Sequence, residues 1–288
     1  MFGRARRNRR GRAGGGKGGA MNRLIPNAIT VAALCAGLSG IRFAMDGRWE
    51  WAVTAIVVAA ILDGLDGRMA RLLNGTSKFG AELDSLSDFV AFGVAPALIV
   101  YMWVLNAWGA AGWIICLAYA VCMALRLARF NTMLADPNPP KWQGHFFVGV
   151  PAPAGAGLAL LPLMLHFQAG TGWFDRPAIG AATMALVAFL MVSRIPTFSG
   201  KKLHLPRGWM VPGLVAAGLI FAGLLNAPWA TLVILGIVYL AAIPVAVVVQ
   251  RRMRAAEPPP EPAVAEAAGL VTVTLETPAS PPRPPQNA

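Results

Sequence analysis

Four aspartates recur at short, regular spacings in a largely apolar stretch of the chain. Asp63 and Asp66 are three residues apart, and Asp84 and Asp88 are four residues apart. On a helix, either spacing places both side chains on one face. Carboxylate oxygens gathered in this number are the hard ligands that Mg²⁺ and Mn²⁺ prefer. The pattern therefore predicts a site for divalent cations.

The segment between the two pairs of aspartates predicts a tight hairpin. Residues 74–78 read Asn-Gly-Thr-Ser-Lys, which is turn-forming chemistry, so two helices would return antiparallel and bring the carboxylates together. Gly67 and Gly80 leave the backbone bare beside the acids, where a phosphate group could approach. Arg71 lies one turn beyond Gly67 and suits a phosphate or a carboxylate partner.

These acids need neutralisation if they lie at membrane depth. An aspartate at the centre of a membrane helix costs roughly 2.5–3.5 kcal/mol on insertion scales. One interpretation is that the aspartates pair with Arg68 and Arg71. The acids of the hairpin outnumber these nearby bases, which favours bound cations.

The composition indicates that the positioning elements are membrane helices. The chain has 288 residues, of which 56% are hydrophobic and 13% charged. Soluble domains are closer to a quarter charged. We predict an all-α, polytopic membrane helix bundle with about eight transmembrane helices. The expected helices span residues 26–45, 49–73, 80–106, 109–133, 149–168, 178–194, 209–226 and 229–250.

Composition also divides the chain into three parts. We expect a basic, disordered arm at 1–23, a transmembrane catalytic domain at 24–252 and a flexible tail rich in Pro, Ala and Glu at 253–288.

The distribution of basic residues predicts the orientation. Eight helices would place both termini on one side. All but three of the 25 Lys and Arg then lie on the proposed inner side, and the exceptions are Arg42, Arg48 and Arg176. This asymmetry predicts cytoplasmic termini. The net charge of +12 is divided into short clusters between apolar segments, which indicates membrane lipids and no nucleic acid as the partner.

The acids belong to a longer pattern that resembles a known signature. The chain reads Asp63-x2-Asp66-Gly67-x2-Ala70-Arg71-x8-Gly80-x3-Asp84-x3-Asp88. This resembles the D-x2-D-G-x2-A-R-x8-G-x3-D-x3-D motif of the CDP-alcohol phosphatidyltransferases, with every fixed position filled. The resemblance implies a six-helix family core, here with two further helices, and an active site facing the cytoplasm. For a bacterial member it also implies the inner membrane and a homodimer.

The resemblance further implies roles for the motif residues. Asp63, Asp66 and Asp84 would hold two Mg²⁺ or Mn²⁺ ions, with Asp88 as a further ligand and the catalytic base. The expected CDP-binding residues are Asn27, Thr30, Asp66, Gly67, Ala70, Arg71 and Gly80. For Asn27 and Thr30, an ordinary helix start is an equally good interpretation, because both residue types cap helices well.

The acceptor is inferred from two further likenesses. Segments 62–71 and 83–96 look like the branch of the family that uses serine, which implies transfer of the phosphatidyl group from CDP-diacylglycerol to L-serine. Arg126, Arg129 and Asn131 are the expected acceptor-binding residues, because the serine carboxylate needs a cation. Alternatively, these arginines anchor the helix at lipid phosphates.

Two other functions remain open at this point. Glycerol 3-phosphate, inositol phosphate and choline are alternative acceptors within the same family. A cation-coupled membrane transporter is a more distant alternative, which predicts acids near mid-membrane on broken helices in two repeated halves.

Overall fold

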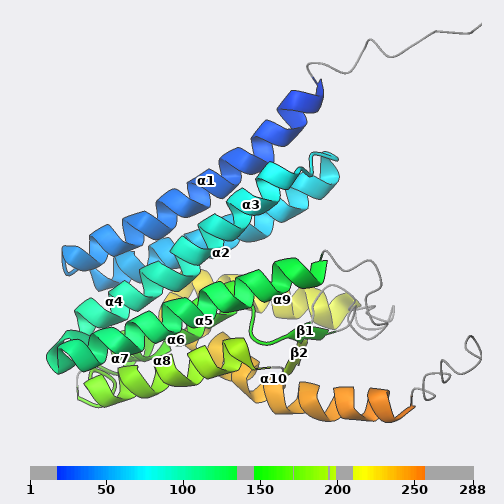
Figure 1. Cartoon of the computed structure of the whole chain (residues 1–288). Coiled ribbons are helices and arrows are strands. Elements are labelled where there is room, and N and C mark those ends of the chain that lie inside the picture. Colours follow the sequence, from blue (N-terminus) through cyan, green and yellow to red (C-terminus); the bar gives the residue numbers. More distant parts are fainter. Residues whose placement is uncertain (1–17, 135–145, 171, 194, 199–209, 257–288) are drawn as a thin grey trace, which may run out of the picture. The chain divides into compact units, whose positions relative to one another are not determined.

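The chain is helical along most of its described length, as the computed structural model shows for residues 18–134, 146–170, 172–193, 195–198 and 210–256 (Figure 1). Residues 1–250 form one compact unit and residues 251–288 a second. The elements of the first half are α1 (Gly18–Met45), α2 (Trp49–Leu72), α3 (Lys78–Asp88), the π-helix η1 (Phe89–Val94), α4 (Ala95–Trp103), the 3₁₀-helix η2 (Leu105–Trp108) and α5 (Ala110–Leu134). Those of the second half are β1 (Phe146–Val148), α6 (Ala152–Ala159), α7 (Leu161–Ala169), α8 (Pro177–Val192), β2 (Pro196–Phe198), α9 (Met210–Asn226) and α10 (Pro228–Ala256).

Small residues allow α1 to pack closely on its neighbours. α1 and α2 lie side by side in an extensive contact (Figure 1). A Cβ on Gly40 of α1 would lie 3.2 Å from the carbonyl oxygen of Ala52 on α2. Farther along, a Cβ on Gly37 would lie 2.7 Å from the Cα of Ala91 in η1. Small residues at such contacts let membrane helices approach at backbone distance.

The predicted hairpin between α2 and α3 is confirmed. Asn74 takes the left-handed conformation, with φ of 49°, and the Gly75 N–H donates to the Ala70 carbonyl oxygen. Ser77 then caps α3, because its Oγ accepts from the Gly80 N–H at 3.0 Å. Two short polar contacts thus close the turn, and α3 returns to pack on α1.

Helical segments occupy all eight predicted places, but fewer of them are long and apolar enough to cross a membrane. Within the described residues, four helices are long and apolar enough to cross a bilayer. They are Asn22–Met45, Lys78–Trp103, Ala110–Met133 and Pro228–Val249. The bent pair α6 and α7 would make a fifth span if it crosses as one. α8 and α9 are shorter apolar helices. The chain is thus a helical protein with several apolar helices suited to a membrane, and eight crossings stay a prediction.

Two predicted continuous helices are interrupted at prolines. The predicted helix at 80–106 contains the π-helical turn η1 just before Pro96. The predicted helix at 149–168 breaks into α6 and α7, which are bent by 42° next to Pro162. Proline removes one helical hydrogen bond and crowds the carbonyl four residues earlier, which explains both interruptions.

Two details differ from the expectations. The expected all-α architecture is confirmed for most of the described residues, but a short two-stranded antiparallel sheet of β1 and β2 accompanies the helices, in which Phe146 pairs with Phe198. The arm at 1–23 was expected to be disordered, yet α1 begins at Gly18. The Asn22 side chain donates to the Leu73 carbonyl oxygen at 3.0 Å, which ties this first turn to the α2–α3 hairpin. Residues 1–17 and 257–288, with most of the predicted arm and tail, lie outside the described residues.

The apolar core of the first unit lies where η1, α4 and α5 meet. Its largest fully buried side chains include Phe92, Ile99, Leu105, Tyr119 and Met123. This packing holds η1, which directly follows the helix that carries Asp84 and Asp88.

Candidate active site

Three of the four aspartates bring carboxylate oxygens together between α2 and α3. One oxygen each of Asp63, Asp66 and Asp84 lies within 4.8 Å of the other two. Asp66 is buried, and the other two are half-buried. The prediction that acids from two helices meet at one point is therefore confirmed for these three residues. Carboxylates this close repel one another unless a cation or a proton lies between them.

Asp88 joins this cluster through Asp63. It is the last residue of α3, and its side chain is within hydrogen-bonding distance of the Asp63 side chain. Asp88 is not part of the set of three close oxygens, so it lies at the edge of the cluster. This edge faces α5, because Arg126 interacts electrostatically with both Asp88 and Asp63.

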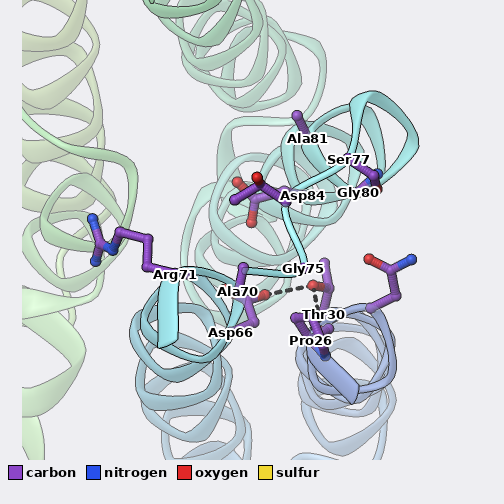
Figure 2. Close-up of a pocket in the computed structure, with 13 residues that line it drawn as sticks. Pro26, Thr30, Asp66, Ala70, Arg71, Gly75, Ser77, Gly80, Ala81 and Asp84 are labelled. Carbon is purple, nitrogen blue, oxygen red and sulfur yellow. Dashed lines mark hydrogen bonds between the residues drawn. The ribbon is translucent and has the colours of Figure 1, made fainter. Parts of the chain in front are cut away.

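A threonine of α1 contacts the acid cluster directly. Thr30 is buried, and its hydroxyl donates to Oδ2 of Asp66 at 2.6 Å. The same hydroxyl lies 3.0 Å from the Pro26 carbonyl oxygen. The contact with Asp66 is the shorter of the two. Figure 2 shows Thr30 and Asp66 facing each other from neighbouring helices.

A pocket of about 210 Å³ opens beside Thr30 and Asp66 (Figure 2). Asp84 enters it from α3. All seven residues expected to bind CDP line this pocket, namely Asn27, Thr30, Asp66, Gly67, Ala70, Arg71 and Gly80. The hairpin residues Gly75, Thr76 and Ser77 form another part of its wall. The pocket therefore joins the start of α1, the end of α2 and the start of α3 around the acids.

Two glycines shape the pocket in different ways. A Cβ on Gly80 would lie 2.9 Å from Oδ1 of Asn27, so a larger residue on α3 would displace the Asn27 side chain of α1. A Cβ on Gly67 would meet nothing within 4 Å, so it would project into open space at the pocket. Gly67 therefore keeps room for a ligand, whereas Gly80 leaves room for the Asn27 side chain.

The alternative pairing of the aspartates with nearby arginines has no support. Arg68 and Arg71 are both exposed, and in the described part of the chain neither forms an ion pair with the four aspartates. Arg71 lies at the rim of the pocket, with its side chain extended away from Thr30 (Figure 2). It is placed to contact a bound group and leaves the acids without a partner of opposite charge on α2.

The three residues expected to bind the acceptor have different surroundings. Arg126 is buried beside Asp88 and Asp63, with its guanidinium 5.9 Å from the centre of the Phe130 ring. Arg129 donates to the carbonyl oxygens of residues 191, 192 and 193 at 3.0, 2.8 and 3.2 Å, so it binds the C-terminal end of α8. Asn131 donates to the Ser85 hydroxyl at 2.9 Å. Of the three, Arg126 is the one for which an electrostatic interaction with Asp88 and Asp63 is described.

Comparisons with known proteins agree with this geometry. The sequence model described as CDP-alcohol phosphatidyltransferase matches residues 23–194, and one described as CDP-alcohol phosphatidyltransferase 2 matches residues 208–244. The chain belongs to the CDP-alcohol phosphatidyltransferase family. The first match includes α2, α3, α5 and α1 from residue 23 on, which are the elements that build the site.

Several relatives in this family carry one name, CDP-diacylglycerol–serine O-phosphatidyltransferase. The protein of this name from Mycobacterium tuberculosis is 41% identical over 239 residues, or 82% of each chain. That from Helicobacter pylori is 38% identical over 210 residues, or 71% of this chain and 84% of the relative. That from Bacillus subtilis is 34% identical over 171 residues, or 59% and 88% of the two chains.

The residues present fit the divalent metal that CDP-alcohol phosphatidyltransferases generally use. Three carboxylate oxygens within 4.8 Å of one another form the hard, anionic donor set that Mg²⁺ and Mn²⁺ take. The close approach of Asp63 and Asp88 adds negative charge at the same place. A bound cation would relieve this repulsion.

Sequence reasoning missed some of the residues that hold the site together. Ser87 is buried on α3 and donates to the Thr30 carbonyl oxygen at 3.2 Å. Asn22 ties α1 to the hairpin through Leu73. Tyr119 is fully buried and bonds to η1 next to Asp88. Ser87 lies next to Asp88 in the motif, which was an available signal, but nothing in the sequence marked Asn22 or Tyr119.

Proposed function

We propose that this CDP-alcohol phosphatidyltransferase transfers the phosphatidyl group of CDP-diacylglycerol to the hydroxyl of L-serine, giving phosphatidylserine and CMP. The observation that carries the reaction type is the cluster of Asp63, Asp66 and Asp84 beside a pocket lined by the other motif residues. The serine acceptor is supported by the relatives from Mycobacterium tuberculosis and Helicobacter pylori. They are 41% and 38% identical over 82% and 71% of this chain.

In the proposed site, the four aspartates hold two Mg²⁺ or Mn²⁺ ions. Bound there, the ions supply charge neutralisation for the diphosphate and the departing CMP. Gly67 leaves room for the phosphates and the cytidine part of the donor, and Gly80 lies at the pocket wall close to Asn27. Arg71 at the pocket rim contributes a positive charge for the same group.

Asp88 is the proposed base. It accepts the proton of the serine hydroxyl while that oxygen attacks the β-phosphorus, and the bond between the β-phosphorus and the CMP oxygen breaks. Such an in-line displacement depends on positioning and electrostatics. Arg126 is the proposed partner of the serine carboxylate next to Asp88, because it is buried and interacts electrostatically with that side chain. Arg129 and Asn131 support this site indirectly through α8 and Ser85.

The proposed setting is the inner membrane of a bacterium, with both termini and the active site on the cytoplasmic side. The distribution of Lys and Arg supports this orientation. We further propose that all eight helical segments cross the membrane, that the chain forms a homodimer, and that residues 1–23, 24–252 and 253–288 serve as arm, catalytic domain and tail. The lipid tails of the donor would then stay in the bilayer while serine enters from the cytosol.

The test of this function is CMP release by the purified protein in detergent. CDP-diacylglycerol and a divalent metal are supplied with L-serine, glycerol 3-phosphate, inositol phosphate or choline as the sole acceptor. We expect release with serine and its loss in Asp88→Asn. The matched control is Asp46→Asn, which changes an exposed aspartate in the α1–α2 loop. Release only with another acceptor would keep the site but refute serine as substrate.

A further inference from the structure

The helix that carries Asp84 and Asp88 continues directly into a π-helical turn. This turn, η1, begins at Phe89, the residue after Asp88. At its end, the Ala95 N–H donates to the Val90 carbonyl oxygen, five residues earlier. Single π-helical turns within α-helices are rare and occur frequently at functional sites. The position of η1 next to Asp88 therefore calls for a local physical cause.

The cause lies in Pro96 and Tyr119. In an α-helix, the Phe92 carbonyl oxygen would accept from the N–H of residue 96. Pro96 has no N–H, and its ring crowds the carbonyl four residues earlier. The Tyr119 hydroxyl of α5 instead donates to the Phe92 carbonyl oxygen at 3.0 Å. Tyr119 is fully buried, so no solvent could replace this donor.

Tight packing on both sides holds the turn in this form. Gly37 of α1 lies against Ala91, where an added Cβ would come within 2.7 Å of the Ala91 Cα. Gly93 faces α5, and a Cβ there would lie 3.0 Å from Cγ of Met123. A helix turns by roughly 100° per residue, so one extra residue in a turn changes which way the preceding face points. The π-helical turn thus sets the direction in which the face of α3 with Asp84 and Asp88 points, relative to the buried face of α4.

We propose that Tyr119 is a positioning residue for the transfer reaction. Its hydroxyl holds η1 in the π-helical form, and η1 directs the Asp88 side chain toward Asp63 and Arg126. This inference rests on the proposed role of Asp88 as base and metal ligand. Tyr119 itself touches neither the acids nor the pocket residues in the contacts described above.

The test is Tyr119→Phe, which removes only the hydroxyl. We expect kcat to fall by about tenfold or more, because small displacements of reacting groups are costly, while KM for CDP-diacylglycerol changes less than about twofold. The affinity for Mn²⁺, followed by electron paramagnetic resonance, should fall with kcat. Tyr101→Phe is the matched control, because it makes the same change on α4, where the Tyr101 ring contacts Trp113 of α5.

Two outcomes would overturn the inference. One is that Tyr119→Phe keeps the kcat and the Mn²⁺ affinity of the unchanged protein, even if its unfolding temperature falls. The other is that kcat falls only in proportion to the folded fraction. If Tyr119→Phe does not fold, Gly93→Ala displaces the same turn against the Met123 side chain and should give the same pattern. Asp88→Asn, measured in parallel, tests the proposed base separately, since its full activity would refute that role and not the packing of η1.

Discussion

The Thr30 hydroxyl on α1 donates a hydrogen bond of 2.6 Å to Oδ2 of Asp66 on α2. The backbone carbonyl of Thr30 also accepts from the Ser87 hydroxyl on α3. One residue of the first helix thus contacts both helices that carry the aspartates, and all three of these residues are buried. α1 is therefore part of the site as well as a helix that is long and apolar enough to cross a membrane.

Replacing Thr30 by valine should weaken catalysis without loss of the fold. Thr30→Val keeps the shape of the side chain but removes the proton that Asp66 accepts. A hydrogen bond to a charged group is worth about 1.5–3 kcal/mol, so we expect a loss of roughly tenfold or more in kcat/KM. Thr30→Ser should retain most of the activity, because it keeps the hydroxyl.

Thr54→Val is the matched control for this measurement. Thr54 is exposed on α2, and its hydroxyl lies 2.8 Å from the Glu50 carbonyl oxygen. The activity of the Thr54→Val variant should equal that of the unchanged protein in the same CMP-release assay. Equal losses at Thr30 and Thr54 would indicate a general effect of valine on the helices and contradict a specific role of Thr30.

The two glycines of α2 allow a test of the pocket. Both Gly64 and Gly67 have open space at the position of a Cβ, but only Gly67 lines the pocket. We expect Gly67→Ala to raise KM for CDP-diacylglycerol by about tenfold, as overpacking a close-fitting site costs about 1–3 kcal/mol. Gly64→Ala should leave KM unchanged. Alanine favours the helix at both places, so a shared loss of activity would argue against the pocket as the donor site.

Much of this site could be predicted from the sequence because it is built by residues that lie close together in the chain. Asp63 and Asp66 share a helical face by spacing alone, and the residues from Asn74 to Lys78 form the expected turn. The π-helical turn could not be predicted in this way. It depends on Tyr119, which is distant in the sequence and contacts Phe92 only once α4 and α5 have packed.

The two arginines of α5 show the same limit. Arg126 and Arg129 are three residues apart, and the sequence alone gave no reason to separate them. Folding places Arg126 beside Asp88 and brings Arg129 to the carbonyl oxygens at the end of α8. The difference depends on where α8 packs. That position is set by tertiary packing, which local sequence patterns do not predict.

These two arginines should therefore respond differently to replacement by glutamine. Arg126→Gln should raise KM for serine strongly while the unfolding temperature changes little. Arg129→Gln should lower the unfolding temperature, because it loses hydrogen bonds to the carbonyls of buried Met191 and half-buried Ser193, and leaving such groups unpaired costs about 1–3 kcal/mol. Serine-dependent CMP release and thermal unfolding in detergent check both. A rise in KM for Arg129→Gln alone would reverse our assignment of the two side chains.

Removal of metal should abolish activity reversibly. After chelation, the protein should release no CMP, and Mg²⁺ or Mn²⁺ should restore the reaction. Asp84→Asn removes one of three clustered carboxylates, so Mn²⁺ affinity should fall by at least about tenfold. Glu82→Gln is the control, because Glu82 is an exposed acid of the same helix outside the cluster. Full activity in the chelated protein would exclude the proposed metal site.

The central claim is tested most directly by measuring both products of one reaction in vesicles that contain the purified protein. Isotopically labelled L-serine and CDP-diacylglycerol are supplied with Mg²⁺ or Mn²⁺, and phosphatidylserine and CMP are quantified together. We predict equal amounts of the two products, with both lost in Asp88→Asn and both retained in Asp46→Asn. CMP without labelled phosphatidylserine, or equal product formation by Asp88→Asn, would contradict the account.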